Sequence, residues 1–509
     1  MATPSEKLAK SLEVLHTLQQ TEKLAAIRSA DLTRAHRERL LKNGFLKEVL
    51  KGWYIATRPD EQPGDTTGWY ATFWPFCSAY LHKRFGNQWV LSPEQSIALH
   101  SGNRVVPQQL LIRSPKANNN ETKFLFGTSL FDICATLPLD SEVEVKEGLR
   151  MYSLAAALVF CSPLHFTRAE MDVRNALALV RDASDLLDIL LRGGHSVVAG
   201  RLAGAFRNIG NDRMADELVQ TMQLAGYEVR EEDIFASKLP AGLSFREVSP
   251  YVNRIRLLWQ SMRGPVLEHF PTAPGQPHDP DAYLQQVDDA FVADAYHSLS
   301  IEGYQVTPAL IERVRLGQWN PDQIESDQGQ KNALAARGYW QAHQGVKQTI
   351  SAILQGKNAG ECVEKDHRNW YRELFAPSVS VGLLKASDLA GYRSGQVYIR
   401  GSRHVPLSRD AVRDTMPVFF ELLGEEPEPA VRVVLGHFIF VYIHPYMDGN
   451  GRIGRFLMNA MLASGGYGWT IIPVSERQSY MQALEKASVE QDIADFAVFL
   501  ARQVRKTQT

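Results

Sequence analysis

The sequence is short of cysteine, and this shortage excludes two classes of protein. Its 509 residues include four cysteines, which lie far apart at Cys77, Cys134, Cys161 and Cys362. They form no C-x-x-C pair and no other spacing typical of metal ligands. A disulfide framework and a zinc site are therefore excluded, and free thiols in a reducing compartment are expected.

Long hydrophobic runs are also lacking. The longest, Val433–Ile443, is interrupted by Gly436 and His437 and is too short to cross a bilayer. The first residues, MATPSEKLAKSLEVL, have no apolar run after their charges and so do not form a secretory signal. These features predict a soluble, cytoplasmic protein without membrane contact.

The chain also lacks an excess of charge of one sign. Its 55 Lys and Arg residues nearly balance its 57 Asp and Glu residues, so no global field attracts nucleic acid or a membrane. The segment 1–57 differs, because it has ten basic residues against six acidic ones. Any nucleic-acid role must come from such a local patch.

The pattern of apolar residues and turns predicts a multidomain, mainly α-helical protein. In the segment 1–57, Glu22–Leu32 is predicted to form one helix. A second helix, Arg34–Lys42, is capped by Thr33 and ended by the following Asn-Gly pair. A small hairpin around Gly52 completes the outline of a winged helix-turn-helix.

Three further segments follow. Residues 58–245 mix strand-like and helical patterns, which is typical of an α+β domain. Residues 246–283 contain a helix and then four prolines within ten residues, so a linker or a surface loop is expected there. Residues 284–509 are nearly all helical, except that 395–407 alternates as a β-hairpin does.

The most informative residues form the stretch His444–Arg455, with the sequence HPYMDGNGRIGR. An apolar helix ends here, because Pro445 cannot continue it, and a new helix starts near Arg452. The glycines of the turn let backbone N–H groups converge at the positive end of the new helix. Together these groups predict an anion cradle.

Four side chains give this loop its chemistry. Arg452 and Arg455 lie three residues apart on the new helix and can hold phosphate in a bidentate manner. Asp448 offers a hard oxygen ligand for Mg²⁺, and His444 is a base near neutral pH. The set predicts attack by a hydroxyl on a nucleotide phosphate. The alternative is a common glycine turn beside a structural histidine.

These residues resemble the motif of the Fic family, H-x-F-x-(D/E)-G-N-G-R-x-x-R, with Tyr446 in place of Phe as the single departure. The resemblance covers roughly residues 285–500 and implies an all-α Fic core with a β-hairpin flap. It implies that His444 deprotonates a Ser, Thr or Tyr hydroxyl of a target protein or of the chain itself. That oxygen would attack the α-phosphate of ATP and expel pyrophosphate.

The resemblance also implies which residues hold the ligands. Asp448 would hold Mg²⁺, and Arg455 would bind the γ-phosphate. The remaining phosphate contacts would come from Gly449, Asn450, Gly451 and Arg452. Doc-type kinases of this family have Lys at the position of Gly451, so the resemblance favours transfer of AMP over phosphorylation.

A second signature, Ser298-Leu299-Ser300-Ile301-Glu302-Gly303, resembles the inhibitory motif of the family, (S/T)-x-x-x-E-(G/N). Ser298 and Glu302 are one helical turn apart, and Gly303 is suited to end the helix. The resemblance implies that Glu302 pairs with Arg455 in place of the γ-phosphate. In some relatives this glutamate also supports removal of AMP. The alternative is a solvated glutamate before a glycine cap.

Two more segments resemble parts of the family. Residues 395–407 match the flap that holds the backbone of the target by strand addition. Pro473, Arg477 and Tyr480 match the segment near the nucleoside, which implies that Tyr480 contacts the nucleotide. Ser488 stands where the family has an Asn that helps to recognise adenosine, so the base preference stays open.

The N-terminal segment resembles the DNA-binding module of abortive-infection antitoxins, through ERLLKNGFLKEVLKGWYIA, and residues 60–235 resemble the domain that follows it. The resemblance implies phosphate contacts from the second helix, through Arg34, Arg37, Arg39 and Lys42. A solvated basic helix in a protein-interaction wing is the alternative.

Three functions stay open at this point. The first is an autoinhibited protein adenylyltransferase that also removes AMP in reverse. The second is a DNA-binding repressor that uses the Fic fold as a nucleotide sensor, although a sensor needs no general base. The third keeps the enzyme but transfers UMP or a phosphoryl group. Fic relatives often dimerise, so a homodimer is open as well.

Overall fold

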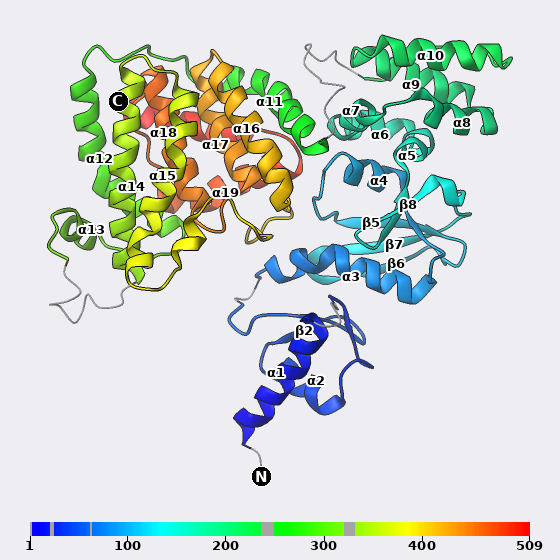
Figure 1. Ribbon diagram of the computed structural model, residues 1–509, viewed down its shortest axis with the longest axis horizontal. Coiled ribbons are helices and arrows are strands. Elements are labelled where there is room, and N and C mark those ends of the chain that lie inside the picture. Colours follow the sequence, from blue (N-terminus) through cyan, green and yellow to red (C-terminus); the bar gives the residue numbers. More distant parts are fainter. Residues whose placement is uncertain (1–2, 21–24, 62–63, 236–248, 320–330, 509) are drawn as a thin grey trace. The chain divides into compact units, whose positions relative to one another are not determined.

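The computed structural model describes residues 3–20, 25–61, 64–235, 249–319 and 331–508 (Figure 1). The contacts within the chain divide it into two compact units. Unit 1 comprises Met1–Arg254 and Tyr398–Val405, and unit 2 comprises Ile255–Val397 and Pro406–Thr509. The described residues are mainly helical, as the sequence predicts.

Unit 1 begins with two helices and a small antiparallel sheet. The helices are α1 (Pro4–Gln20) and α2 (Arg34–Lys42), and the strands are β1 (Ile27–Arg28), β2 (Leu46–Leu50) and β3 (Trp53–Ala56), in the order β1-β3-β2. Thr33 caps α2, because its side chain accepts a hydrogen bond from the N–H of His36 at 3.4 Å. Gly52 turns the β2–β3 hairpin with a φ of 83°. Both features match the prediction.

The predicted helix Glu22–Leu32 is wrong. Its described residues form β1 and a turn, in which the carboxylate of Asp31 accepts hydrogen bonds from the backbone and guanidinium of Arg28. Ile27 is fully buried in the core of this small domain. Pairing with β3 and burial of Ile27 therefore override the local helical pattern. Residues 21–24 lie outside the described part.

The rest of unit 1 is α+β, as predicted. α3 (Thr67–Phe85) and α4 (Pro93–His100) accompany a mixed sheet in the order β4-β5-β7-β6, in which β5 and β7 are parallel. The strands are β4 (Val90–Leu91), β5 (Gln109–Ser114), β6 (Asn120–Lys123) and β7 (Ser129–Cys134). The hairpin of β8 (Val143–Lys146) and β9 (Leu149–Tyr152) follows. The helices after it are α5 (Leu154–Phe160), α6 (Pro163–Arg168), α7 (Glu170–Leu179), α8 (Ala183–Gly193), α9 (Ser196–Asn208) and α10 (Asp212–Leu224).

The boundary between the units falls within α11 (Pro250–His269), and Pro265 lies inside this helix. The next three prolines, Pro271, Pro274 and Pro277, belong to a surface loop of unit 2 rather than to a free linker, and Pro280 begins the next helix. The hydroxyl of Tyr467 donates to the carbonyl of Pro271 at 2.6 Å. The N–H of Gly275 donates to the carbonyl of Gly465 at 3.1 Å.

Unit 2 is a helical bundle built around two buried helices, α17 (Pro429–Ile443) and α18 (Asn450–Gly465). α17 is apolar on nearly every face, which is typical of a helix enclosed by others. The enclosing helices, seen in Figure 1, include α12 (Pro280–Ile301), α14 (Lys331–Leu354), α15 (Ala359–Ser380) and α16 (Arg409–Glu425). The unit also contains α13 (Pro308–Arg315), α19 (Arg477–Val489) and α20 (Ala494–Gln508).

The predicted hairpin at 395–407 forms its turn but not its strands. The N–H of Ser402 donates to the carbonyl of Ile399 at 3.1 Å, and Gly401 has a φ of 78°. In the described chain this segment contains no β-strand. In a β-hairpin, backbone N–H groups would donate to the carbonyls at the two ends of this segment. Here side chains donate to them instead, as the amide of Gln396 does to the carbonyl of Pro406 at 2.7 Å. Pro406 also has no N–H to donate to a neighbouring strand.

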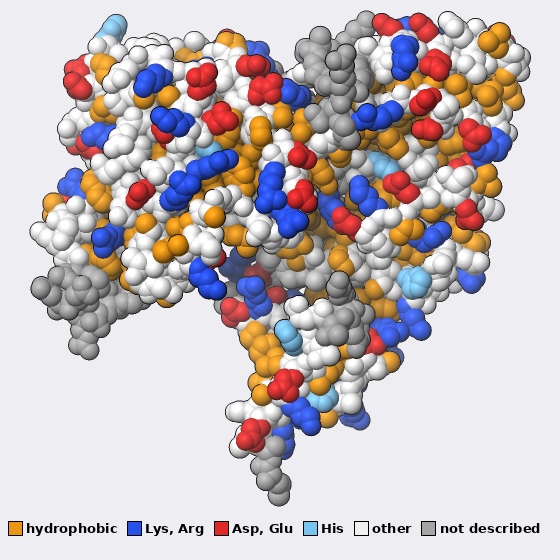
Figure 2. Space-filling view, viewed as in Figure 1, with side chains coloured by type: hydrophobic (Ala, Val, Ile, Leu, Met, Phe, Trp, Pro, Cys, Tyr) orange, Lys and Arg blue, Asp and Glu red, His pale blue; other side chains and the backbone are white. Residues whose placement is uncertain are grey.

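The surface agrees with the balanced composition. On the face shown in Figure 2, acidic and basic side chains are interspersed. Among the described helices, none combines the length and the apolar character needed to span a bilayer.

Candidate active site

The loop between α17 and α18 is shaped by His444 and Asn450. α17 ends at His444, whose backbone is left-handed with a φ of 56°, a conformation that few non-glycine residues adopt. Asn450 accepts from the N–H of Tyr446 and donates to the carbonyl of Tyr446, both at 2.8 Å. The ring of Tyr446 stacks on that of Tyr371, with centroids 3.9 Å apart. Tyr446 therefore keeps the packing role of the motif aromatic, and Asn450 holds the loop in shape.

The imidazole of His444 is arranged as a neutral base. Its Nδ1 lies 3.1 Å from the carbonyl oxygen of Val441, and donation from Nδ1–H leaves the lone pair on Nε2. Burial lowers the pKa of His444 to about 4, and the positive charge of Arg393 acts in the same direction. The imidazole is therefore unprotonated at neutral pH, as a general base must be.

The N-terminus of α18 has the backbone geometry that an anion cradle needs, and anion binding there stays a prediction. Gly449 precedes the helix with a φ of 81°, and the first N–H groups of a helix have no partner within it. A Cβ atom at Gly451 would lie only 2.3 Å from Oε1 of Glu302. The carboxylate of Glu302 therefore reaches into the cradle, directly beside Gly451.

Asp448 is suited to a metal that is bound together with phosphates. Its side chain is 66% exposed, and its Oδ1 accepts a hydrogen bond from the N–H of Gly449 at 2.6 Å. The described residues contain no cluster of three acidic, His or Cys side chains that could enclose a metal. One exposed carboxylate beside an anion cradle fits Mg²⁺, which binds through few carboxylates together with phosphate oxygens and water.

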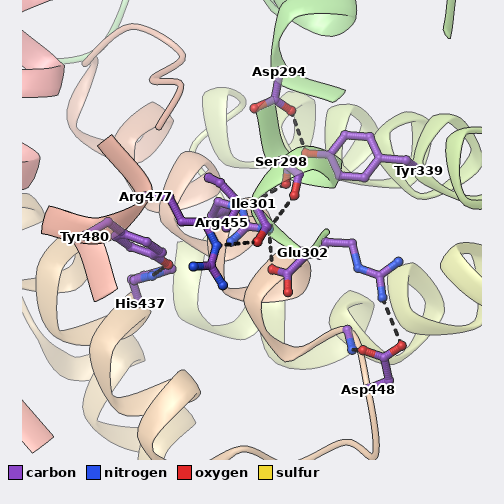
Figure 3. A network of polar contacts seen from close by, with 12 residues as sticks. Asp294, Ser298, Ile301, Glu302, Tyr339, His437, Asp448, Arg455, Arg477 and Tyr480 are labelled. Carbon is purple, nitrogen blue, oxygen red and sulfur yellow. Dashed lines mark hydrogen bonds and ion pairs between the residues drawn. The ribbon is translucent and has the colours of Figure 1, made fainter. Parts of the chain in front are cut away.

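The two arginines of the loop have different partners, although the sequence places them on one side of α18. Arg455 donates from Nε to Oγ of Ser298 at 2.8 Å and from Nη2 to Oε1 of Glu302 at 2.7 Å (Figure 3). The guanidinium of Arg452 lies 3.3 Å from Asp448. It is also 5.3 Å from the ring centroid of Tyr304.

The predicted inhibitory motif lies at the end of α12, against Arg455. Glu302 caps the helix and Gly303 follows with a φ of 88°, so the helix ends where predicted. Burial raises the pKa of the Glu302 carboxyl, but attraction to Arg455 and then Arg452 outweighs it, and the net pKa is lowered. Glu302 is thus a charged partner of Arg455. Nε of Arg477 holds the same turn by donating to the carbonyl of Ile301 at 2.8 Å.

Tyr480, predicted to contact the nucleotide, is a buried residue beside Arg455. Its side chain is 1% exposed, and its hydroxyl lies 2.7 Å from Nε2 of His437 (Figure 3). Burial raises the pKa of Tyr480 to about 12, so the phenol stays neutral. In this structure Tyr480 is paired with His437, and its contact with a nucleotide stays a prediction. Asn459 bonds to backbone carbonyls and is structural, and Ser488 is buried in α19.

The four basic residues predicted to contact DNA lie on α2. Arg34 and Lys42 are exposed. Arg37 donates to a backbone carbonyl of the preceding turn at 3.2 Å, whereas Arg39 donates to the hydroxyl of Ser11 on α1 at 2.7 Å. Arg39 therefore holds α1 against α2, and DNA contact stays a prediction for this helix.

Sequence reasoning missed a buried acid one turn before Ser298. Asp294 accepts a hydrogen bond from the hydroxyl of Tyr339 at 2.7 Å (Figure 3). Burial raises the pKa of Asp294 to about 6. The sequence could have indicated that Asp294 lies near the site, because a residue four positions before Ser298 is on the same face of the helix. Its partner, Tyr339 on α14, lies 45 residues later in the chain and belongs to no recognised motif, so the pairing could not be predicted.

Comparison with known proteins places a family match in the C-terminal half of the chain. The profile of the Fic/DOC family matches residues 363–462. The chain is 40% identical over 120 residues to protein adenylyltransferase Fic of Nematostella vectensis, which covers 23% of this chain and 27% of that protein. It is 38% identical over 235 residues to the protein of the same name from Drosophila willistoni, which covers 45% and 43%. The chain thus matches less than half the length of these curated relatives.

Solved structures give weaker likenesses. A fragment of Fic-1 from C. elegans has a TM-score of 0.37 at 17% identity, with 68% of this chain and 96% of that chain covered. A Fic domain containing signaling protein from Bacteroides thetaiotaomicron has a TM-score of 0.35 at 18% identity, with 50% and 93% covered. From the family profile and the curated relatives, the C-terminal region of this chain carries a domain of the Fic/DOC family.

Proposed function

We propose that this chain is an autoinhibited protein adenylyltransferase, which transfers AMP from ATP to a Ser, Thr or Tyr hydroxyl of a target protein or of itself. One observation carries the proposal. The carboxylate of Glu302 reaches into the cradle over Gly451 and bonds to Arg455. An anion already occupies the place that the cradle and the arginine offer to a phosphate, beside a neutral imidazole.

The proposed reaction needs one proton acceptor, which is Nε2 of His444. It takes the proton of the target hydroxyl while the hydroxyl oxygen forms a bond to the α-phosphorus of ATP. The bond from that phosphorus to the bridging oxygen breaks, and pyrophosphate leaves with its electrons. The low pKa of His444 keeps the imidazole free to accept this proton.

The cradle and its arginines orient the triphosphate for this attack. The N–H groups at the start of α18 and the guanidinium of Arg455 provide hydrogen-bond donors for phosphate oxygens. Asp448 would hold Mg²⁺, which neutralises phosphate charge when it is bound. A donor set fixed before the substrate arrives lowers the barrier, because little reorganisation remains.

Glu302 opposes the reaction by competing for Arg455. A hydrogen bond between charged groups contributes about 1.5–3 kcal/mol, and every 1.36 kcal/mol changes a rate tenfold. Removing the carboxylate should therefore raise transfer by roughly 10-fold to 100-fold. ATP that binds while Glu302 holds Arg455 lacks a γ-phosphate partner and adopts a less productive pose.

The test is incubation with ATP labelled at the α-phosphate, followed by mass spectrometry of the protein. We expect weak labelling of the wild type, strong labelling of Glu302→Gly and none of His444→Ala. Glu490→Gly is the matched control, because Glu490 also caps the C-terminus of a helix, α19, but is exposed on the surface. Equal labelling of the wild type and Glu302→Gly would contradict autoinhibition.

The same experiment separates the alternatives. An added mass of AMP supports the proposal, whereas an added phosphoryl group would replace it with phosphorylation. A parallel incubation with UTP that adds UMP more strongly than ATP adds AMP would replace it with transfer of UMP. Loss of AMP from labelled Glu302→Gly protein, on addition of wild-type protein, would reveal the reverse reaction. Absence of any transfer would favour a nucleotide sensor.

A further inference from the structure

Arg393 connects three segments around the candidate active site, although it belongs to no motif considered above. Its side chain is 2% exposed. Its Nε donates to the carbonyl of His444 at 2.7 Å, and its Nη1 donates to the carbonyl of Gly395 at 2.9 Å. Its Nη2 donates to the carbonyl of Leu407. One guanidinium thus binds the catalytic loop and both stems of the flap, residues 395–407.

The bond to His444 adds a restraint on the backbone beside that of Asn450, and it satisfies a carbonyl that lacks a helical partner. The carbonyl of His444 follows the last turn of α17, where carbonyl groups lack helical partners, and His444 has left-handed backbone angles. The N–H of Arg393 adds a second link, to the carbonyl of Pro445 at 2.9 Å. The backbone that carries the proposed base is therefore held by the side chain and the main chain of one residue.

The bonds to the flap stems do what a strand ladder would do in a hairpin. The flap contains no β-strand in the described chain, so its two stems are not joined by a regular ladder. Arg393 joins them through Gly395 and Leu407, and Gln396 adds a bond to Pro406. The spacing of the stems and their position relative to His444 depend on the same guanidinium.

We propose that Arg393 is a positioning residue, which holds the two stems of the flap, at Gly395 and Leu407, and the His444 backbone in one fixed geometry so that a hydroxyl docked beside these stems meets the base. This inference rests on the proposed function. Arg393 does not touch the reacting atoms in this arrangement. Lysine cannot replace it, because a point charge does not reproduce the planar fork that serves three carbonyl groups in different directions.

The test uses the full chain with Glu302→Gly as the parent, and measures initial rates of self-labelling against ATP concentration. Arg393→Ala should lower kcat by about 30-fold or more, while the KM for ATP stays within about twofold, because the phosphate cradle is untouched. Arg393→Lys should be slowed nearly as far. Free guanidinium ion should partly restore Arg393→Ala but not Arg393→Lys. Arg409→Ala is the control, since Arg409 is exposed and pairs with Asp410.

The outcomes separate this inference from the proposed function. An unlabelled parent would contradict the proposed function. A labelled parent with an equally labelled Arg393→Ala variant would contradict only the inference, as would a KM for ATP that rises in step with the loss of kcat. If Arg393→Ala loses its melting transition, Arg393→Lys decides: a folded Lys variant at the parental rate overturns the proposal, and a slowed one supports it.

Discussion

At the residue scale, the pKa of His444 sets the pH range in which the proposed reaction runs. An imidazole with the usual pKa near 6.5 would lose its base function below about that pH. Burial lowers the pKa of His444 to about 4, with Arg393 lowering it further and Glu302 and Asp448 opposing. Since the neutral form is the base, labelling of Glu302→Gly protein should be nearly constant from about pH 5.5 to pH 8.

The measurement is the initial rate of labelling at saturating ATP across this range, with Mg²⁺ in excess. In Glu302→Gly protein, the carboxylate that raises the pKa of His444 is absent. The pH at which the labelling rate falls should therefore be lower in this variant than in the wild type. A half-maximal rate near pH 6.5 would show that the imidazole is hydrated like an ordinary exposed histidine.

The hydroxyl of Ser298 offers a second test at this scale. It accepts a hydrogen bond from Nε of Arg455 at 2.8 Å, beside the Glu302 bond to the same guanidinium. Ser298→Ala should weaken the inhibitory pair and raise basal labelling, by less than Glu302→Gly does. The two changes share one partner and so should not add. A double variant that is more active than Glu302→Gly alone would mean that Ser298 restrains the enzyme by another route.

At the scale of elements, the contact between α12 and α14 includes a buried bond from the hydroxyl of Tyr339 to Asp294. Burial raises the pKa of Asp294 to about 6, so the carboxyl is mostly protonated at pH 5 and ionised at pH 8. A folded-state pKa above the unfolded value means that this group contributes less stability as pH rises through that range. The hydroxyl of Tyr339 offsets part of this loss by donating to the ionised form.

Tyr339→Phe should therefore lower the melting temperature more at pH 8 than at pH 5, because a buried carboxylate that loses a donor costs about 1–3 kcal/mol. The protein with Asp294→Asn, which has no charge to desolvate, should show no such pH difference on Tyr339→Phe. Equal losses at both pH values would mean that Asp294 does not ionise while the protein is folded.

The sequence predicted correctly those helix ends that are determined by a few neighbouring residues. The cap at Thr33, the end of α12 at Gly303 and the break at His444 each depend on a few adjacent residues. The strand β1 was missed, because it exists through pairing with β3 and burial of Ile27. The strands of the flap were predicted from alternation, but side-chain bonds from Arg393 and Gln396 hold its stems.

The candidate site shows the same division. His444, Asp448 and Arg455 could be named because a compact loop carries them. Glu302 could be paired with Arg455 only through the resemblance to a family motif, since 153 residues separate them. Arg393 and Tyr339 act through contacts between distant segments, and a single sequence without such a motif gives no signal for pairing of that kind.

At the scale of the whole molecule, the chain has two units with separate predicted tasks. The residues proposed to transfer the nucleotide all lie in unit 2, and the basic helix α2 lies in unit 1. With a net charge of −2, attraction to DNA must come from α2 itself, since no global field assists it. Arg39 is held by Ser11 of another helix. Arg34 pairs with Glu38 on the exposed side of α2 and Arg37 donates to a nearby backbone carbonyl, so phosphate would compete with these local bonds at Arg34 and Arg37, and Lys42 is the third predicted contact.

Replacing these three residues by Gln in the full chain should weaken binding to a duplex from its own promoter and leave labelling by the Glu302→Gly parent unchanged. Each lost phosphate contact removes roughly 0.9 from the slope of log K against log salt concentration, so the slope should fall by about 2.7. Arg39→Gln is the control: it should lower the melting temperature, because it frees α1 from α2, and leave the slope nearly intact. If DNA binding by the parent does not depend on salt concentration, α2 is instead a solvated basic surface for a protein partner. If only Arg39→Gln lowers the slope, Arg39 itself contacts the phosphate, and the prediction for the other three residues is wrong.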